Sequence, residues 1–190
     1  MYLVASNIIR SCWIIFSIVW LFGAMSTKRT VYRESGGRRL RHVIPILIGF
    51  FLLFRGHRFI YPLNLRVIPP MDAIGLAAAI LCVFGLAFCL WARATLGRNW
   101  SGTVTLKEGH ELIVRGPYRL VRHPIYTGLL ALVVGTAIQH GHLAGMIAAL
   151  LVFVSFWIKL TSEEEVMTRQ FGNAYVAYQQ RVKRLIPFVL

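Results

Sequence analysis

The sequence predicts an all-α integral membrane protein with about five transmembrane helices, and three observations support this fold class. Of the 190 residues, 57% are hydrophobic and the mean hydropathy is +0.63, whereas only about half of the residues of a soluble domain are apolar. Four stretches approach or exceed the roughly 20 apolar residues that a helix needs to cross a bilayer. Basic residues, which give a net charge of +14, alternate with these stretches. A nucleic-acid binder would gather them on one water-facing surface, so no nucleic acid is expected as a partner.

The apolar stretches divide the chain in a regular way. They cover residues 3–25, 43–61, 71–92 and 124–160. The last stretch is about two crossings long, and polar residues interrupt it at 139–142, which predicts a helical hairpin of 124–139 and 143–160. No basic residue precedes the first stretch and no small-residue cleavage site follows it, so we expect a retained span and not a signal peptide.

The loops between the predicted spans differ in charge. Segments 26–42 and 93–123 each carry six Lys or Arg and the tail carries four, whereas 62–70 has only Arg66 and the hairpin turn has none. Because cytoplasmic loops retain Lys and Arg, this alternation predicts an external N-terminus and a cytoplasmic C-terminus. We expect a single domain over 1–190, with N-terminal spans in 1–92 and a catalytic core in 93–190.

Charged and thiol side chains within the apolar stretches need a separate explanation. Arg10, Arg55 and Arg58 lie within or at the edges of predicted spans, where each must snorkel to the surface or face a polar interior. The three cysteines lie inside apolar stretches and form no C-x-x-C pair. We expect neither a disulfide framework nor a metal site, and interpret the cysteines as small packing residues.

Two polar segments, 111–128 and 159–187, flank the predicted hairpin, so antiparallel hairpin helices would bring them together. In the first segment Gly116-Pro117 marks a turn, and Pro124 stands where the apolar helix begins. His123 is then expected at the membrane surface beside the positive end of a helix dipole. There it can meet a polar ligand, or it can belong to a purely structural basic cap.

The second segment opens with three glutamates, 163–165, in a chain that has only seven acidic residues. If they begin a helix, they can stabilise its positive end. Alternatively, they can bind a ligand through its hydroxyl or ammonium groups. Beyond them Phe171, Tyr175 and Tyr178 recur every three to four residues, which predicts an amphipathic C-terminal helix folded against the membrane face.

Several short motifs follow one another in the second half of the chain, over about 90–190. They are TLGRNWS at 95–101, EL at 111–112, GPYR at 116–119, RHPIYTG at 122–128, EE at 163–164, FG at 171–172, Tyr175, Tyr178, RV at 181–182 and Pro187. In this order around an apolar hairpin they closely resemble the isoprenylcysteine carboxyl methyltransferase family and its phospholipid methyltransferase relatives. The resemblance implies methyl transfer from S-adenosylmethionine to a lipophilic membrane acceptor, in the first place the carboxylate of a prenylated cysteine.

The resemblance also implies a cofactor pocket at the cytosolic end of the hairpin, with S-adenosylhomocysteine as the product. Lys159 and Arg122 are the candidate catalytic residues. Lys159 stands where the prenylcysteine enzymes carry an arginine, and it offers a point charge in place of a planar fork. No metal is implied, and no activated nucleophile is needed because methyl transfer requires alignment and desolvation more than a strong base. The candidate cofactor-binding residues are Leu112, Val114, Gly116, Tyr118, His123, Pro124, Tyr126, Glu163 and Glu164.

Three other functions stay open at this point. A phospholipid amine N-methyltransferase uses a similar set of motifs. A membrane NADPH-dependent reductase resembles the C-terminal architecture, although the G-x-G-x-x-G fingerprint of dinucleotide binding is absent. A non-enzymatic membrane scaffold would bind no cofactor. The acceptor site is expected among the N-terminal spans, where no transferable motif occurs, so neither the acceptor nor the oligomeric state follows from these motifs.

Overall fold

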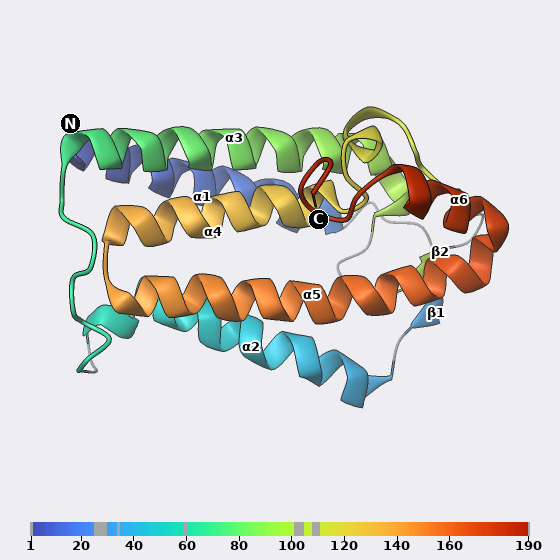
Figure 1. The fold of residues 1–190 in the computed structure, drawn as a ribbon, viewed down its shortest axis with the longest axis horizontal. Helices are drawn as coiled ribbons and strands as arrows, with labels where there is room; N and C mark the ends of the chain where they lie inside the picture. Colours follow the sequence, from blue (N-terminus) through green and yellow to red (C-terminus); the bar gives the residue numbers. More distant parts are fainter. Residues whose placement is uncertain are drawn as a thin grey trace.

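The computed structural model describes residues 2–24, 30–33, 35–58, 61–100, 105–107 and 111–189, with side chains omitted at 24, 30–33, 57, 98 and 105–107. The long helices run alongside one another, and a tight turn between α4 and α5 lies at one end (Figure 1). We call this the turn end. The opposite end, which carries the short helix α6, is called the α6 end.

The helices form two groups, and the contact between α4 and α5 joins one group to the other. In the first group α3 packs extensively on α4, and α1 packs on α3; in the second, α2 packs on α5. The left-handed Gly141, with φ of +70°, allows the chain to reverse between α4 and α5. The bounds are α1 Tyr2–Ala24, α2 Gly36–Phe54, α3 Asp72–Leu96, α4 Pro124–His140, α5 Leu143–Phe171 and α6 Asn173–Arg181, with 3-10 turns η1 Gly56–Arg58, η2 Gly97–Asn99 and η3 Gly116–Arg119.

Small residues allow α3 and α4 to approach closely. A Cβ placed on Gly85 would lie 2.5 Å from the carbonyl oxygen of Gly128, and a Cβ on Gly128 would lie 2.5 Å from that of Gly85. Cys12, Cys82 and Cys89 are buried and unbridged, which confirms their interpretation as packing residues. Membrane helices associate through such small residues because lipid tails provide no hydrophobic drive between them.

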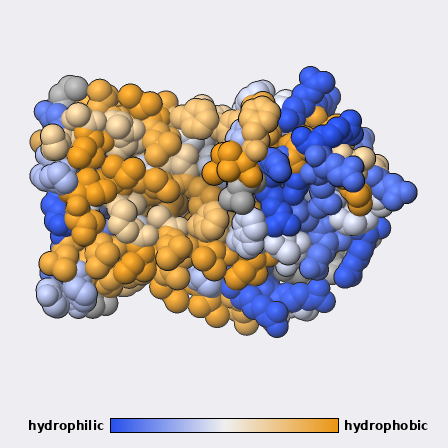
Figure 2. All heavy atoms as spheres, viewed as in Figure 1, coloured by the Kyte–Doolittle hydropathy of each residue, from blue (hydrophilic) through white to orange (hydrophobic). Residues whose placement is uncertain are grey.

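The predicted membrane fold is confirmed, while the count of five spans stays a prediction. Among the described residues, three helices are long and apolar enough to cross a membrane: α1 over Tyr2–Gly23, α3, and α5. Helix α4 is apolar but has 17 residues, and α2 has 19 residues and begins with arginines. Hydrophobic side chains cover most of the length of the bundle, and hydrophilic ones gather at the α6 end (Figure 2).

The second helix differs from the predicted range of 43–61. Helix α2 covers Gly36–Phe54. It begins before the apolar run, because the amphipathic residues that precede this run form its first turns. Arg55 and Arg58 therefore lie beyond the helix at the turn end, and both are exposed. Arg10 is exposed on the outer face of α1, so none of these three arginines faces a polar interior.

Helix α5 is longer than the predicted hairpin helix of 143–160. It continues through the glutamates to Phe171, and its 29 residues extend about 44 Å, compared with about 30 Å of hydrocarbon core. The glutamates thus lie within a helix and not at its start, so stabilisation of a helix N-terminus is the wrong explanation for them. Gly172, with φ of +53°, allows the turn into α6, which is the expected C-terminal helix.

A pair of short strands adds an element that the sequence did not predict. Strand β1 (Thr30–Arg33) pairs antiparallel with β2 (Thr105–Lys107) at the α6 end (Figure 1). The fold is therefore helical with one small sheet. The pairing joins the two most basic loops, which were expected on the same side of the membrane.

The close α3–α4 contact gives a stability prediction. Replacing Gly85→Ala places a methyl group against backbone, so the two helices must separate, and overpacking of this kind costs about 1–3 kcal/mol. We expect a lower Tm in detergent. Gly36→Ala is the matched control, because nothing lies within 4 Å of a Cβ there. An unchanged Tm for Gly85→Ala would contradict the contact.

Candidate active site

A cavity of about 390 Å³ lies at the α6 end of the bundle. One part of its lining is polar, and the other part, which we call the apolar arm, is aromatic and aliphatic. The polar part includes Asn99, Tyr118, Arg122, His123, Tyr126, Lys159 and Glu163. The apolar arm comprises Phe16 and Trp20 of α1, Ile46 and Phe50 of α2, Leu129 of α4 and Phe156 of α5.

The two polar segments that flank the hairpin converge, as predicted. The backbone N–H of Arg122 donates to the carbonyl of Lys183 at 2.7 Å, and that of His123 donates to Arg184 at 3.0 Å. The Tyr178 hydroxyl donates to the carbonyl of Tyr118 at 2.6 Å. The C-terminal tail is therefore attached along the RHP motif, directly before α4.

The carboxylate of Glu164 holds this arrangement from the inside. Its Oε1 accepts from Arg122 Nε at 2.7 Å and lies 3.0 Å from His123 Nε2. Its Oε2 accepts from Gln179 Nε2 at 3.2 Å and from Arg184 Nε at 3.0 Å. Glu164 is 3% exposed and does not line the cavity. Its oxygens bind the tail and the RHP motif together.

Arg122 belongs to the same hydrogen-bond network as Glu164, although it also lines the cavity. Besides Glu164, its guanidinium contacts two tail carbonyls, donating from Nη1 to Gln179 at 3.2 Å and to Val182. The guanidinium of Arg122 is thus bonded to Glu164 and to the C-terminal tail. These contacts position the RHP motif, and the catalytic role of Arg122 stays a prediction.

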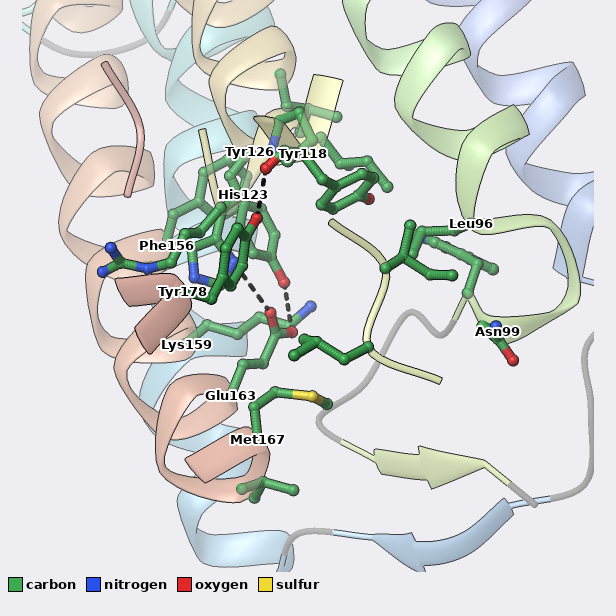
Figure 3. Close-up of a pocket in the computed structure, with 18 of the residues that line it drawn as sticks. Leu96, Asn99, Tyr118, His123, Tyr126, Phe156, Lys159, Glu163, Met167 and Tyr178 are labelled. Atoms are coloured by element: carbon green, nitrogen blue, oxygen red, sulfur yellow. Dashed lines mark hydrogen bonds and ion pairs between the residues drawn. The ribbon is translucent and has the colours of Figure 1, made fainter. Parts of the chain in front are cut away.

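Glu163 and Lys159 are two of the charged residues that line the cavity, along with Glu111 and Arg122. Successive residues of a helix differ by about 100° in direction, so Glu163 faces the cavity while Glu164 faces the tail. The Tyr126 hydroxyl donates to Glu163 Oε1 at 2.6 Å, and His123 Nδ1 lies 3.7 Å from Oε2. Lys159, one turn earlier, is buried with its ammonium 5.4 Å from the centre of the Tyr126 ring (Figure 3).

The structure brings most of the predicted cofactor-binding residues to the cavity. Val114 is 44% exposed, Gly116 packs against Thr95 of α3, and Glu164 is buried elsewhere, so none of these three lines it. Their predicted roles in binding are not supported by this position. The predicted residues that do line it are Leu112, Tyr118, His123, Pro124, Tyr126 and Glu163, together with Lys159 and Arg122.

Asn99 is a cavity residue that the sequence reasoning did not select. Its Oδ1 is buried and has no hydrogen-bond partner among the described residues. Figure 3 places it across the cavity from Lys159 and Glu163. Trp100 beside it lies under the Arg93 guanidinium at 4.5 Å. Both Asn99 and Trp100 belong to the TLGRNWS motif, and this motif is the feature of the sequence that could have indicated them.

The buried tyrosines around the cavity remain neutral. Burial raises the pKa of Tyr118 well above its usual range, and the neighbouring Tyr178 and Glu163 raise it further. Burial likewise raises the pKa values of Tyr175 and Tyr178. The Tyr178 hydroxyl acts as a hydrogen-bond donor, and raised pKa values disfavour the phenolate form of all three. No cluster suited to a metal ion occurs in the described ranges.

The fold and the cavity define a helical membrane protein with a pocket at its α6 end that joins polar to apolar walls. The sequence model of the phospholipid methyltransferase family matches residues 74–174, which is over half of the chain. The chain belongs to this family, and the resemblance noted from its motifs is confirmed.

Individual relatives carry a narrower name. The chain is 34% identical over 113 residues to a probable protein-S-isoprenylcysteine O-methyltransferase of Oryza sativa subsp. indica, covering 58% of this chain and 59% of that protein. It is 36% identical over 98 residues to protein-S-isoprenylcysteine O-methyltransferase B of Arabidopsis thaliana, covering 50% of each. The mouse enzyme of that name is 30% identical over 129 residues, covering 66% of this chain and 44% of that protein. The chain thus spans only about half the length of these relatives.

A solved structure shares the fold. It is that of the eukaryotic intramembrane Ras methyltransferase ICMT, which aligns with a TM-score of 0.51 over 84% of this chain and 55% of that one. The sequence identity is 23%, so this similarity concerns the fold alone.

The two adjacent glutamates should differ in their effect on stability. Glu164→Gln leaves the buried guanidinium of Arg122 and the partly exposed one of Arg184 without their charged partner, and breaking a buried ion pair costs about 3 kcal/mol or more. We expect a clear fall in Tm in detergent. Glu165→Gln, at an exposed position of the same helix, is the control and should leave Tm nearly unchanged. Similar Tm values for both variants would contradict the central position of Glu164.

Proposed function

We propose that this chain is an S-adenosylmethionine-dependent methyltransferase that methylates a lipophilic acceptor at a carboxylate, as in prenylcysteine O-methylation. The observation that carries the proposal is the cavity itself. A single cavity contains a polar wall, suited to a water-soluble cofactor, and an apolar arm between α1 and α2, suited to a lipid chain. Substrates of opposite polarity can therefore meet inside it. The names of the relatives agree with this chemistry.

The polar wall fits the cofactor. Glu163 can accept hydrogen bonds from ribose hydroxyls or from the ammonium group of S-adenosylmethionine, because a carboxylate has about four acceptor sites and only Tyr126 and His123 lie against its oxygens among the contacts described. The buried Asn99 Oδ1, unpaired among the described residues, needs a donor, and a buried acceptor without one costs about 1–3 kcal/mol. Leu112 and Tyr118 supply apolar surface for an adenine ring. His123 and Pro124 complete the wall.

Lys159 is the residue that suits a carboxylate acceptor. Its ammonium is buried beside the Tyr126 ring and lies where the polar wall meets Phe156 of the apolar arm. A positive charge at this junction attracts an acceptor carboxylate and repels an ammonium group. Lys159 therefore offers the acceptor a single point charge, where the resembling enzymes carry an arginine.

The residues of the chain orient and desolvate the reactants and transfer no proton. When bound, S-adenosylmethionine supplies an electrophilic methyl group on a sulfonium. A carboxylate acceptor arrives ionised, so no general base is required, and the neutral phenols of Tyr118 and Tyr178 agree with this. Lys159 holds the acceptor carboxylate, and the walls around it exclude water, which strengthens both the charge interaction and the nucleophile.

Methylation of a phospholipid amine is the second candidate. The family description names phospholipids, and Glu163 can attract an ammonium group as readily as Lys159 attracts a carboxylate. Deeper burial of the lysine favours the carboxylate, since Lys159 is buried whereas Glu163 is half-buried. Membership of a methyltransferase family favours neither a reductase nor a scaffold.

Labelled methyl transfer decides between the acceptors. The purified protein is incubated with isotopically labelled S-adenosylmethionine and either N-acetyl-S-farnesylcysteine or phosphatidylethanolamine, and the products are analysed by mass spectrometry. We expect label in the base-labile methyl ester of the farnesylcysteine. Lys159→Met should reduce this transfer at least about tenfold while cofactor binding persists. Label only in the phospholipid would support amine methylation and contradict carboxylate methylation. Label in neither acceptor would refute both.

Glu163 gives a prediction that concerns the cofactor alone. Glu163→Gln keeps the shape of the side chain and removes its charge, and a hydrogen bond to a charged group contributes about 1.5–3 kcal/mol. We expect S-adenosylhomocysteine to bind at least about tenfold more weakly by calorimetry, with a Tm close to that of the unmodified protein. Normal affinity would remove Glu163 from the cofactor site.

We further propose that the cavity and the C-terminus are cytoplasmic and the N-terminus external. Most basic residues belong to the α6 end, whereas the turn-end loop 55–71 carries only Arg55, Arg58 and Arg66, which is the asymmetry of a cytoplasmic α6 end. Reporter fusions after residue 190 and within the 141–142 turn should report opposite sides of the membrane. Signals from the same side would contradict the hairpin topology.

A further inference from the structure

The apolar arm of the cavity ends against a tryptophan that does not itself line it. Phe16 of α1 and Phe50 of α2 both line the cavity. The indole of Trp13 contacts both rings from behind, with centroids 5.9 Å and 5.5 Å away and nearly perpendicular planes. On its other side Trp13 contacts Phe54, at 5.6 Å, near the turn end.

A third helix fixes the orientation of this indole. Trp13 Nε1 donates to the hydroxyl of Thr136 on α4 at 2.9 Å. That hydroxyl in turn donates to the carbonyl of Leu132 at 2.7 Å, and Thr136 is buried. Rotating the indole away would take its N–H from this acceptor in an apolar environment. Trp13 is therefore held rigidly among α1, α2 and α4.

The same rings close the space between α1 and α2. Among the described residues the backbones of these two helices have no extensive contact, and aromatic side chains span the distance instead. Phe16 and Phe50 form the cavity side of this partition, while Trp13 and Phe54 form the side toward the turn end. A chain that enters the apolar arm from the polar wall reaches Phe16 and Phe50, and Trp13 packs directly behind these two rings.

We propose that Trp13 is the floor of the acceptor site and sets the length of the lipid chain that the protein accepts. This inference rests on the proposed function, because it needs a lipophilic acceptor in the apolar arm. Trp20, which lines the upper part of the arm, is seven residues from Trp13, so the usable depth along α1 is about 10 Å. A longer chain must displace the aromatic partition or leave between the helices.

A series of N-acetylcysteines carrying geranyl, farnesyl or geranylgeranyl groups tests the floor, since each chain is one isoprene unit longer than the previous one. The measured quantity is the ratio of kcat/KM for the geranylgeranyl acceptor to that for the geranyl acceptor. Trp13→Leu removes the floor and should raise this ratio at least about tenfold, because a single methylene in a fitted pocket already changes selectivity about tenfold or more.

A second substitution works in the opposite direction. Ile46→Phe adds volume within the arm one helical turn from Phe50, and should lower the same ratio by a comparable factor. Trp91→Leu is the matched control, because Trp91 is 49% exposed on α3 and lies outside the cavity; its ratio should equal that of the unmodified protein. If Trp13→Leu does not fold, the smaller change Trp13→Phe takes its place, and the same upward shift of the ratio is expected.

The outcomes separate the inference from the function on which it rests. Unchanged chain-length ratios in folded Trp13→Leu or Ile46→Phe protein would overturn the floor, and would mean that the chain leaves between α1 and α2 into the bilayer. Opposite shifts in the two variants would support it. If the unmodified protein methylates none of the three acceptors, the proposed function fails instead.

Discussion

The buried carboxylate of Glu164 is the constraint on which the rest of the site depends. It accepts hydrogen bonds from Arg122 before α4 and from Gln179 and Arg184 of the C-terminal region, and so joins parts of the chain that are far apart in sequence. A buried carboxylate is costly unless several donors surround it. That cost makes the arrangement all-or-none, because withdrawing the tail would leave a charge with too few partners in a poorly solvated place.

This constraint also determines what faces the cavity. Once Glu164 faces the tail, helix geometry turns Glu163 by about 100°, and Lys159, one turn earlier, follows it to the same wall. One carboxylate is then structural while its neighbour stays available to a ligand. Glu163 and Glu164 are chemically identical, and their surroundings differ because of the orientation of α5 about its own axis.

Helix α5 is long enough to extend from the hydrocarbon core of the membrane into water. The helix is about 44 Å long, exceeds the hydrocarbon thickness, and carries Phe156, Lys159 and Glu163 in order from the apolar to the polar part of the cavity. A lipid chain and a nucleoside cofactor can thus be bound along one helix. The aromatic partition around Trp13 limits the apolar part, since α1 and α2 are separated by side chains and not by backbone contact.

The sequence by itself determined the membrane class, the hairpin around Gly141 and the motif-bearing segments, because apolar length, charge alternation and motif order are local properties. It did not determine the start of α2, the unbroken course of α5, or the β1–β2 pair. Nor did it separate Glu163 from Glu164, select Asn99, or indicate the position of Trp13. Those depend on which face of each helix meets its neighbours, and contacts between distant segments decide that only when the bundle is assembled.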